Sequence, residues 1–422
     1  MSPITIPAGQ PLHAAAAALG GFSVLSYNIL LPNHGDAGWW VFKYYDDAVP
    51  MAQRAWEHRQ ALLREQLLGA MADIVCLQET VADSFEQDLA FLTEAGYAAR
   101  IHRKYHLRCA TFWQEQRWSH VHERHTDKVL TVLLEDRLAG EHLAVVNCHL
   151  NAAPDPRRRF RQLFDALDRL RKDLSARSLD PQAVAVVVCG DFNADLRGTA
   201  THHLLGGNSV GPAFREARYP ESEVSSKARS QPFGPFQELS LAAHGTPRET
   251  LFGGRLSSIF PGWEVTEALV QAVDAVFDRF SAEGRMDVGA IDAWIETING
   301  QPGRGSEHRK ALQILEESGE DSLSRAQFQQ LYRSELGDGK IWSVQHDLQV
   351  CGVVEDDTRA LYAAALDRMY AAEARLEIAG VWEPLSAERR AQLLAEGQGL
   401  PSAWHPSDHL PLGGVFRYTP TG

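Results

Sequence analysis

The most constraining feature of this chain is a run of small and β-branched apolar residues that ends abruptly in polar ones. The run AVAVVVC covers residues 183–189, and Gly190, Asp191, Phe192 and Asn193 follow it. A short valine-rich run bounded by turn residues predicts a strand that is buried on both faces. A buried carboxylate and carboxamide at its end are costly without partners, so they predict a functional site at that sheet edge.

Strand-like and helix-like segments alternate up to this point. The residue patterns predict amphipathic helices over 55–72 and 156–177, and strands over 22–30, 73–79, 108–114, 128–136 and 142–150. This alternation is typical of an α/β fold. The strands at 108–114 and 128–136 are close enough in the sequence to be antiparallel neighbours.

The chain changes character after Asn193. Residues 208–262 are rich in glycine, proline and serine and predict long loops. From 263 to about 396 the pattern of apolar residues is almost wholly helical, and this includes residues 358–376. A strand-like run returns only at 405–418.

This change of pattern predicts the domain organisation. We expect residues 263–397 to form an all-helical insertion. The α/β domain that it interrupts is then formed by residues 1–262 and 398–422.

Charge and hydropathy bound the function. The net charge of −14 argues against broad, nonspecific adhesion to nucleic acid. Two stretches, 99–108 and 157–162, are nevertheless basic, so a local rim can attract a phosphate-bearing substrate. No apolar run is long enough for a transmembrane helix, and the N-terminus lacks the basic start of a signal peptide.

Cysteine usage predicts the compartment. The chain has five cysteines, and Cys76, Cys148 and Cys189 each lie inside an apolar strand-like run. An odd number of cysteines in such positions predicts reduced, structural thiols and a cytoplasmic location.

Polar residues of related types stand at the ends of the predicted strands. Taken singly, each of them is explained by ordinary turn chemistry. Taken together, their carboxylate and amide oxygens suit a hard cation such as Mg²⁺ or Mn²⁺. The set comprises Asn28, Glu79, His149, Asn151, Asp191, Asn193, Asp408 and His409.

In combination and in this order, these motifs resemble the endonuclease/exonuclease/phosphatase superfamily. The likeness covers residues 22–205 and 402–418. Within the superfamily, RCATFW at 108–113 and the pair Arg161 and Gln162 are similar to the deadenylase and nocturnin branch. The resemblance implies an α/β (α+β) fold, a four-layered sandwich of two packed mixed β-sheets flanked by helices.

The resemblance also implies a metal site. Glu79 is then the principal ligand of Mg²⁺ or Mn²⁺, and Asn28 lies beside it. Asp408 completes the site or serves a second ion.

The catalytic roles follow from the same resemblance. Asp191 orients or deprotonates the attacking water. Asn193 holds that water or the phosphate, while His149 and His409 stabilise the transition state of an in-line phosphoester hydrolysis.

One expected motif is missing. In the superfamily a strand that reads like Ile-Asp-Tyr-Ile supplies an aspartate that orients the last histidine. The segment IDAWI at 291–295 is similar, but the surrounding period predicts a helix there. The sequence therefore leaves His409 without an assigned partner.

Residues 38–47 crowd aromatic side chains after the first strand. These side chains either stack on a base or ring of the substrate or pack against the core edge. We expect Trp40, Lys43 and Tyr44 to contact substrate, together with Asn151 and Arg161.

The insertion resembles a degenerate pair of EF-hands. Val288 and Leu323 then occupy the apolar eighth positions of the two loops. With Arg285 as a ligand position in the first loop, and no glutamate at the end of the second, Ca²⁺ binding is not expected.

The leading functional hypothesis is a divalent-metal-dependent nuclease acting on RNA or DNA. On this hypothesis the binding partner is a single-stranded nucleic acid. One alternative is a phosphatase or phosphodiesterase acting on a small molecule or lipid head group. The other is a non-catalytic binding protein that retains the fold. The oligomeric state is not predicted.

Overall fold

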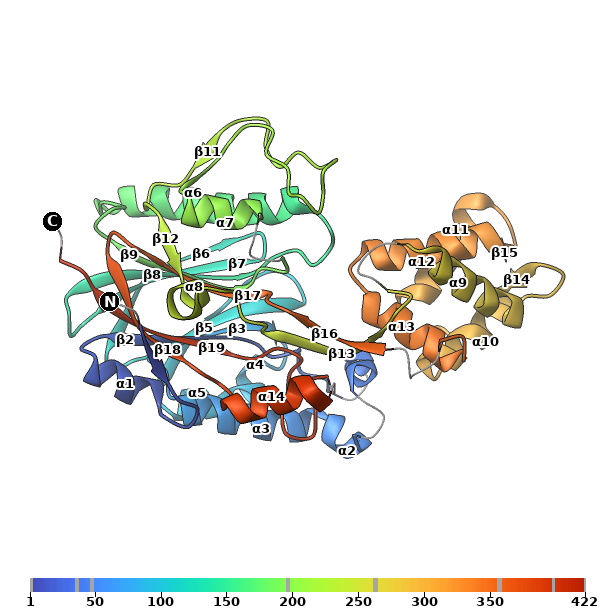
Figure 1. Cartoon of the computed structure of the whole chain (residues 1–422), viewed down its shortest axis with the longest axis horizontal. Helices are drawn as coiled ribbons and strands as arrows, with labels where there is room; N and C mark the ends of the chain where they lie inside the picture. Colours follow the sequence, from blue (N-terminus) through green and yellow to red (C-terminus); the bar gives the residue numbers. More distant parts are fainter. Residues whose placement is uncertain are drawn as a thin grey trace. The chain divides into compact units, whose positions relative to one another are not determined.

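The computed structural model describes residues 3–34, 38–45, 49–194, 198–260, 265–354, 359–396 and 399–420. The chain divides into two compact units (Figure 1). The first comprises residues 1–151, 155–253 and 363–422, and the second comprises residues 152–154 and 254–362.

The first unit contains a mixed seven-stranded sheet in the order β1, β18, β19, β2, β3, β5, β4. β2 runs parallel to β3, and β3 runs antiparallel to β5. The strands are β1 (Ile4–Ile6), β2 (Phe22–Asn28), β3 (Ile74–Val81), β4 (Tyr97–Ile101), β5 (Leu107–Gln114), β18 (Leu376–Trp382) and β19 (Leu412–Tyr418).

A mixed six-stranded sheet packs against it, in the order β12, β17, β9, β8, β7, β6. Here β8 and β9 are parallel, and the other neighbours are antiparallel. The strands are β6 (Trp118–Thr126), β7 (Val129–Asp136), β8 (Glu141–His149), β9 (Ala185–Asp191), β12 (Phe236–Glu238) and β17 (Asp367–Ala372).

Helices cover the outer faces of both sheets (Figure 1). Helices α6 (Pro156–Ser175) and α7 (Ala200–Gly206) pack on the six-stranded sheet, and α1 (Leu12–Ala18) and α3 (Trp56–Ala70) pack on the seven-stranded sheet. Between the sheets, buried side chains such as Phe22 close the core. The predicted α/β sandwich of two mixed sheets flanked by helices is confirmed.

Shorter elements complete the first unit. They are the 3-10 helix η1 (Trp39–Tyr44), α2 (Met51–Arg54), α4 (Phe85–Asp88), α5 (Ala90–Glu94), α8 (Leu239–His244), α14 (Ala387–Glu396), β10 (Ser209–Val210) and β11 (Arg229–Ser230). The strand pair β13 (Leu251–Ser257) and β16 (Arg359–Ala364) spans the two points where the chain passes between units.

The second unit is mostly helical. Its helices are α9 (Glu267–Phe280), α10 (Val288–Asn299), α11 (Ser306–Ser318), α12 (Arg325–Gly337) and α13 (Ile341–Val350). The strands β14 (Arg285–Asp287) and β15 (Ser322–Ser324) join two helix–loop–helix segments as an antiparallel pair. Their apolar side chains form one cluster that includes Trp294 and Phe328.

The prediction of helix over 358–376 is wrong. This segment forms β16 and β17 and begins β18. Its alanines and leucines favour a helix locally, but β17 is buried along its whole length between β9 and β12. Pairing in the sheet therefore overrides propensity. The predicted boundaries at 262–263 and 397–398 fall on residues outside the described ranges, and the second unit ends at Tyr362.

The predicted pairing of 108–114 with 128–136 is also wrong. These segments are β5 and β7, which belong to different sheets. The strand between them, β6, has a histidine-rich and arginine-rich sequence that hides its period, and it is β6 that pairs with β7. Among the described helices, none is long and apolar enough to cross a membrane.

Candidate active site

The two sheets bring the predicted polar residues together at one edge. Asn28 ends β2, and its Nδ2 donates to Asp191 Oδ2 of the other sheet at 3.0 Å. The same Nδ2 donates to Glu79 Oε1 at 3.3 Å, while Asn28 Oδ1 accepts from the backbone N–H of Leu30 at 3.1 Å. Asn28 therefore orients two carboxylates from the centre of the cluster.

Glu79 is turned into the site by an irregularity of its strand. The pairing of β3 with β5 shifts register between Leu77 and Thr80, and Glu79 has a φ of 65°. Such a bulge redirects a side chain that regular pleating would aim elsewhere. Burial and the nearby Asp408 carboxylate raise the pKa of Glu79 to about 7. Its Oε2 is buried and has no hydrogen-bond partner.

Asp191 is fixed on both of its oxygens. Oδ2 accepts from Asn28, and Oδ1 accepts from the backbone N–H of Asn193 at 2.8 Å. Asn193 has a φ of 48° and donates its own Nδ2 to the carbonyl of Leu150 at 3.0 Å. The turn after β9 therefore holds the carboxylate in one orientation.

Gly190 explains why this strand ends as it does. It lies opposite Cys148 in the parallel pair of β8 and β9, with a φ of 134°. A Cβ at this position would lie 1.9 Å from the Cys148 carbonyl oxygen. The strands that carry His149 and Asp191 can approach each other only because this residue is glycine.

His149 ends β8 beside the carboxylates. Its Nε2 lies 3.7 Å from Glu79 Oε1 and 3.8 Å from Asp191 Oδ2. Burial lowers the pKa of His149 to about 4, with Asp191 opposing and Lys128 and His409 adding to the shift. The imidazole is therefore neutral at pH 7.

The partner of His409 is Asp367, the first residue of β17. His409 Nδ1 lies 2.7 Å from Asp367 Oδ2, and its Nε2 lies 3.9 Å from both Asp191 Oδ2 and Asp408 Oδ1. Burial would lower the pKa of His409, but the charges of Asp367 and Asp408 outweigh it and raise that pKa well above its usual value. These carboxylates therefore favour the protonated form of His409.

Sequence reasoning missed Asp367. The signal was present in LDRMY at 366–370, an aspartate in an apolar run between the GDFN and SDH motifs. Because the flanks of this segment are rich in alanine, its pattern indicated a helix. The competing segment at 291–295 lies in α10, and the prediction of helix there is confirmed.

Asp408 and Asn28 are held in place by a buried arginine. Arg59 of α3 donates to the carbonyls of Pro406 and Leu31 at 2.8 Å each and to Asn33 Oδ1 at 2.6 Å. It thereby joins the segment after β2 to the loop before Asp408. Burial raises the pKa of Asp408, and His409 partly offsets the shift.

The residues fit a hard divalent cation around Glu79. Its orphaned oxygen lies among carboxylates, a donor set that Mg²⁺ prefers. Asp191, Asp367 and His409 also bring ligand atoms within 4.8 Å of one another. In that triad, however, Asp367 already contacts His409 Nδ1. We therefore infer that Asp367 orients the imidazole.

The predicted substrate residues lie at different distances from this cluster. Burial raises the pKa of Tyr44 above its usual value, and the charges of Asp408 and Glu79 raise it further, so Tyr44 lies within electrostatic reach of these carboxylates. The rings of Trp40 and Tyr44 are 5.8 Å apart, and Lys43 Nζ lies 5.2 Å from the Trp39 ring.

Two predicted contacts lie on the His149 side. The backbone N–H of Asn151 donates to Gln162 Oε1 at 2.9 Å. Arg161 is exposed on α6, and among the described residues it contacts none of the catalytic cluster.

The loops of the helical unit differ from the predicted register. Met286, not Val288, is buried and paired with Leu323, and Val288 is exposed. Asp287 caps α10, so the apolar position of the first loop lies two residues earlier than the sequence suggested. Counted from Met286, the twelfth position is Ala290, which offers no carboxylate to a cation.

Comparison with curated proteins gives relatives that are named as carbon catabolite repressor 4 or Ccr4 proteins. The chain is 29% identical over 249 residues to carbon catabolite repressor protein 4 homolog 2 of Arabidopsis thaliana, which covers 47% of this chain and 39% of that protein. It is 26% identical over 237 residues to the CCR4-Not complex 3'-5'-exoribonuclease subunit Ccr4 of Candida albicans, covering 44% and 28%. The matched region thus spans well under half of these relatives.

Among solved structures, the fold is similar to that of ANGEL2, described as a 2',3'-cyclic phosphatase. The TM-score is 0.55 at 15% identity, and the match covers 94% of each chain. This likeness concerns the fold.

The family is settled by the extent of the sequence match. The family model of the endonuclease/exonuclease/phosphatase proteins matches residues 25–409. This span holds all the residues of the site, from Asn28 to His409. The likeness to the Ccr4 proteins agrees with the deadenylase-like branch. The chain belongs to the endonuclease/exonuclease/phosphatase family.

Proposed function

We propose that the protein is a divalent-metal-dependent phosphodiesterase that hydrolyses single-stranded nucleic acid, with RNA as its preferred substrate. The observation that carries the proposal is the buried, unpartnered Oε2 of Glu79 among the carboxylates of Asp191 and Asp408. Buried carboxylates that crowd one another favour a cation between them.

Glu79 and Asp408 would hold Mg²⁺ or Mn²⁺, and Asn28 would keep the neighbouring carboxylates in place. When bound, the cation supplies positive charge to the phosphoryl oxygens and to the leaving oxygen. Glu79 has one free oxygen for this purpose, because only Oε1 accepts from Asn28.

Asp191 is the base in this proposal. Its two hydrogen bonds fix the carboxylate so that a water molecule beside it can be oriented and can lose a proton to it. Asn193 shapes the turn that provides one of these bonds, and it would hold that water or the phosphate.

The two histidines stabilise the developing charge. With Nδ1 engaged by Asp367, the protonated form of His409 aims its Nε2–H into the space beside Asp191 and Asp408. His149 is neutral and lies on the other side, near Glu79. Donors fixed before the reaction stabilise a phosphoryl transition state without reorganisation.

The substrate class rests on the relatives and on the aromatic segment. The Candida albicans relative is named as a 3'-5'-exoribonuclease subunit. Trp40, Lys43 and Tyr44 in η1 offer rings and a cation, and Tyr44 lies within electrostatic reach of Asp408 and Glu79, which suits a nucleotide base and its phosphate. We also propose a cytoplasmic location, because all five cysteines are buried free thiols.

The test is hydrolysis of a substrate panel with Mg²⁺ or Mn²⁺, comparing the wild type with Asp191→Asn. The panel contains single-stranded RNA and DNA, 2',3'-cyclic nucleotides, sugar phosphates and choline phosphodiesters. Cleavage of polymers that is lost in Asp191→Asn supports the proposal. Turnover confined to small esters overturns the nuclease assignment, and equal inactivity of both proteins on every substrate favours a binding protein.

A further inference from the structure

We propose that two basic segments beside the active site, residues 100–108 and 157–161, form one surface that binds the phosphate backbone of a single-stranded polynucleotide. We call it the basic surface. The inference rests on the proposed function, because it identifies a polymer, not a small ester, as the substrate. Its readout is nevertheless independent of catalysis.

Charge sets these segments apart from the rest of the chain. Residues 100–108 contain Arg100, Arg103, Lys104 and Arg108 and no carboxylate, and residues 157–161 contain four arginines and no carboxylate. The chain as a whole carries a net charge of −14. Two purely cationic segments in an acidic protein concentrate positive potential in one place.

Each segment has one end near the candidate active site. Arg108 lies opposite Thr80, the residue after Glu79, and its carbonyl accepts from Thr80 Oγ1 at 2.9 Å. The second segment starts α6, a few residues after His149.

The turn between β6 and β7 also borders the active site. The carbonyl of Lys128 accepts from the backbone N–H of His149 at 3.1 Å. A strand with its scissile phosphate at Glu79 therefore has cations on the side of β5 and on the side of α6.

One carboxylate joins the two segments. Asp127, in the turn between β6 and β7, accepts from the hydroxyl of Tyr105 at 2.6 Å and from Gln162 Nε2 at 3.1 Å. Arg158 Nε lies 3.6 Å from the same carboxylate. These contacts tie the loop between β4 and β5, the turn and the start of α6 into one continuous surface.

Several cations of this surface are accessible, although Arg159 is buried. The side chain of Arg103 is 72% exposed even though it pairs with Glu123, and Lys104 and Arg161 are exposed. Within the described residues, neither Lys104 nor Arg161 makes an ion pair. Tyr105 is 43% exposed and offers an aromatic ring on which a base can stack.

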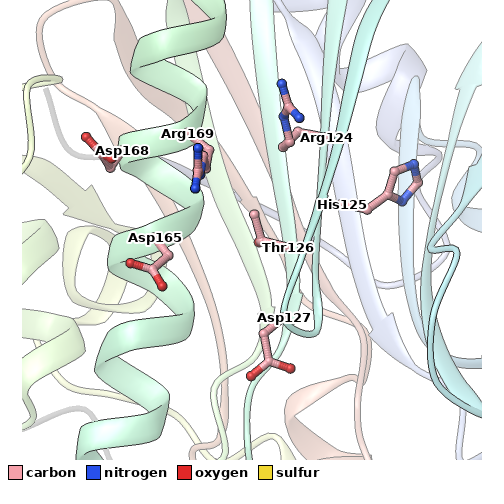
Figure 2. A pocket seen from close by; sticks show the side chains of 7 residues that line it. All are labelled: Arg124, His125, Thr126, Asp127, Asp165, Asp168 and Arg169. Carbon is pink, nitrogen blue, oxygen red and sulfur yellow. The ribbon is translucent and has the colours of Figure 1, made fainter.

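The surface has a boundary further along α6. Figure 2 shows the neighbouring pocket of about 530 Å³, with Asp127 at one end and Asp165 and Asp168 along the helix. The three carboxylates outnumber the two arginines that also line the pocket, Arg124 and Arg169, so the backbone is expected to cross the first turns of α6 and not to follow the helix into this pocket.

The test measures binding of a fluorescein-labelled single-stranded RNA of about 15 nucleotides by anisotropy as salt is varied, without added divalent metal. The double variant Lys104→Glu/Arg161→Glu is compared with the wild type. Each phosphate contact contributes about 0.7 to the slope of log affinity against log salt, so the slope should flatten by about 1.4. Near 0.1 M salt, affinity should fall roughly 10- to 30-fold.

The matched control is Arg137→Glu/Lys172→Glu, which makes the same charge change away from the basic surface. Arg137 follows the far end of β7, and Lys172 lies in the last turn of α6. The control should bind RNA like the wild type. Equal losses in both double variants, or no loss in Lys104→Glu/Arg161→Glu, overturn the inference.

Hydrolysis by the same proteins separates this inference from the proposed function. With Mg²⁺, kcat/KM for the longer RNA should fall in Lys104→Glu/Arg161→Glu by the same factor as binding, while Arg137→Glu/Lys172→Glu should cleave both the longer RNA and a dinucleotide like the wild type. If the wild type binds RNA through this surface but cleaves none, the inference survives and the proposed function fails. If it cleaves RNA and the double variant loses neither binding nor cleavage, the inference alone fails.

Discussion

Single residues of the site are held by hydrogen bonds from buried partners. Arg59 is completely buried, and its guanidinium donates hydrogen bonds to the backbone near Asn28 and Asp408. Lysine could not replace it, because only the planar guanidinium serves several acceptors at once. The sequence offered no sign of this role, since an arginine in an amphipathic helix is usually a solvated residue.

Asp367 positions His409, so its loss should affect turnover and leave metal binding intact. In Asp367→Asn the imidazole loses its charged partner, and kcat should fall about 100-fold or more while KM changes little. Mn²⁺ affinity, measured by electron paramagnetic resonance, should stay the same. A loss of Mn²⁺ binding in this variant would show that Asp367 is a ligand instead.

His405 makes the loop before Asp408 sensitive to acid. Its Nδ1 donates to the carbonyl of Ser407 at 2.8 Å, and burial lowers the pKa of His405 to about 4. Below pH 6.5 the unfolded chain takes up a proton at this residue, and the folded chain does so only near pH 4. The free energy of unfolding should therefore fall as the pH falls between these values.

The contribution of His405 can be isolated by substitution. Between pH 7 and pH 5, the wild type should lose about 2 kcal/mol more than His405→Gln in urea unfolding. Equal losses in the two proteins would show that His405 does not stay neutral in the fold.

At the scale of elements, the parallel pair of β8 and β9 needs glycine at position 190. In Gly190→Ala the new Cβ would meet the carbonyl of Cys148, and the strands would have to separate. We expect a loss of about 3 kcal/mol or more in unfolding free energy, measured in urea. Gly69→Ala in α3, where a Cβ meets nothing within 4 Å, is the control and should not destabilise. A Gly190→Ala protein as stable as the wild type would contradict the close approach.

The elements that the sequence predicted well are those whose local pattern agrees with their surroundings. The valine run of β9 and the amphipathic α6 formed as expected, and the polar residues at the strand ends met at one edge. The strands β6 and β17 were missed because their composition opposes their state, and only pairing with neighbours explains them. Because the pattern of β17 indicated a helix, Asp367 was not identified as the partner of His409.

The chain combines a net charge of −14 with a candidate active site that has basic segments beside it. The first unit carries every residue of the candidate site, and the second is built around its own apolar cluster. The paired loops of the second unit have Ala290 and Gln327 where a Ca²⁺-binding loop has its bidentate glutamate.

The central claim is that Glu79 holds the cation on which hydrolysis depends. The most direct measurement is the rate of single-stranded RNA cleavage as Mg²⁺ is titrated, for the wild type, Glu79→Gln and the control Glu86→Gln, whose glutamate is exposed on α4. We expect Glu79→Gln to lose about 100-fold or more in rate and to need more Mg²⁺, while Glu86→Gln matches the wild type. Equal rates and equal Mg²⁺ dependence in all three proteins would contradict the account.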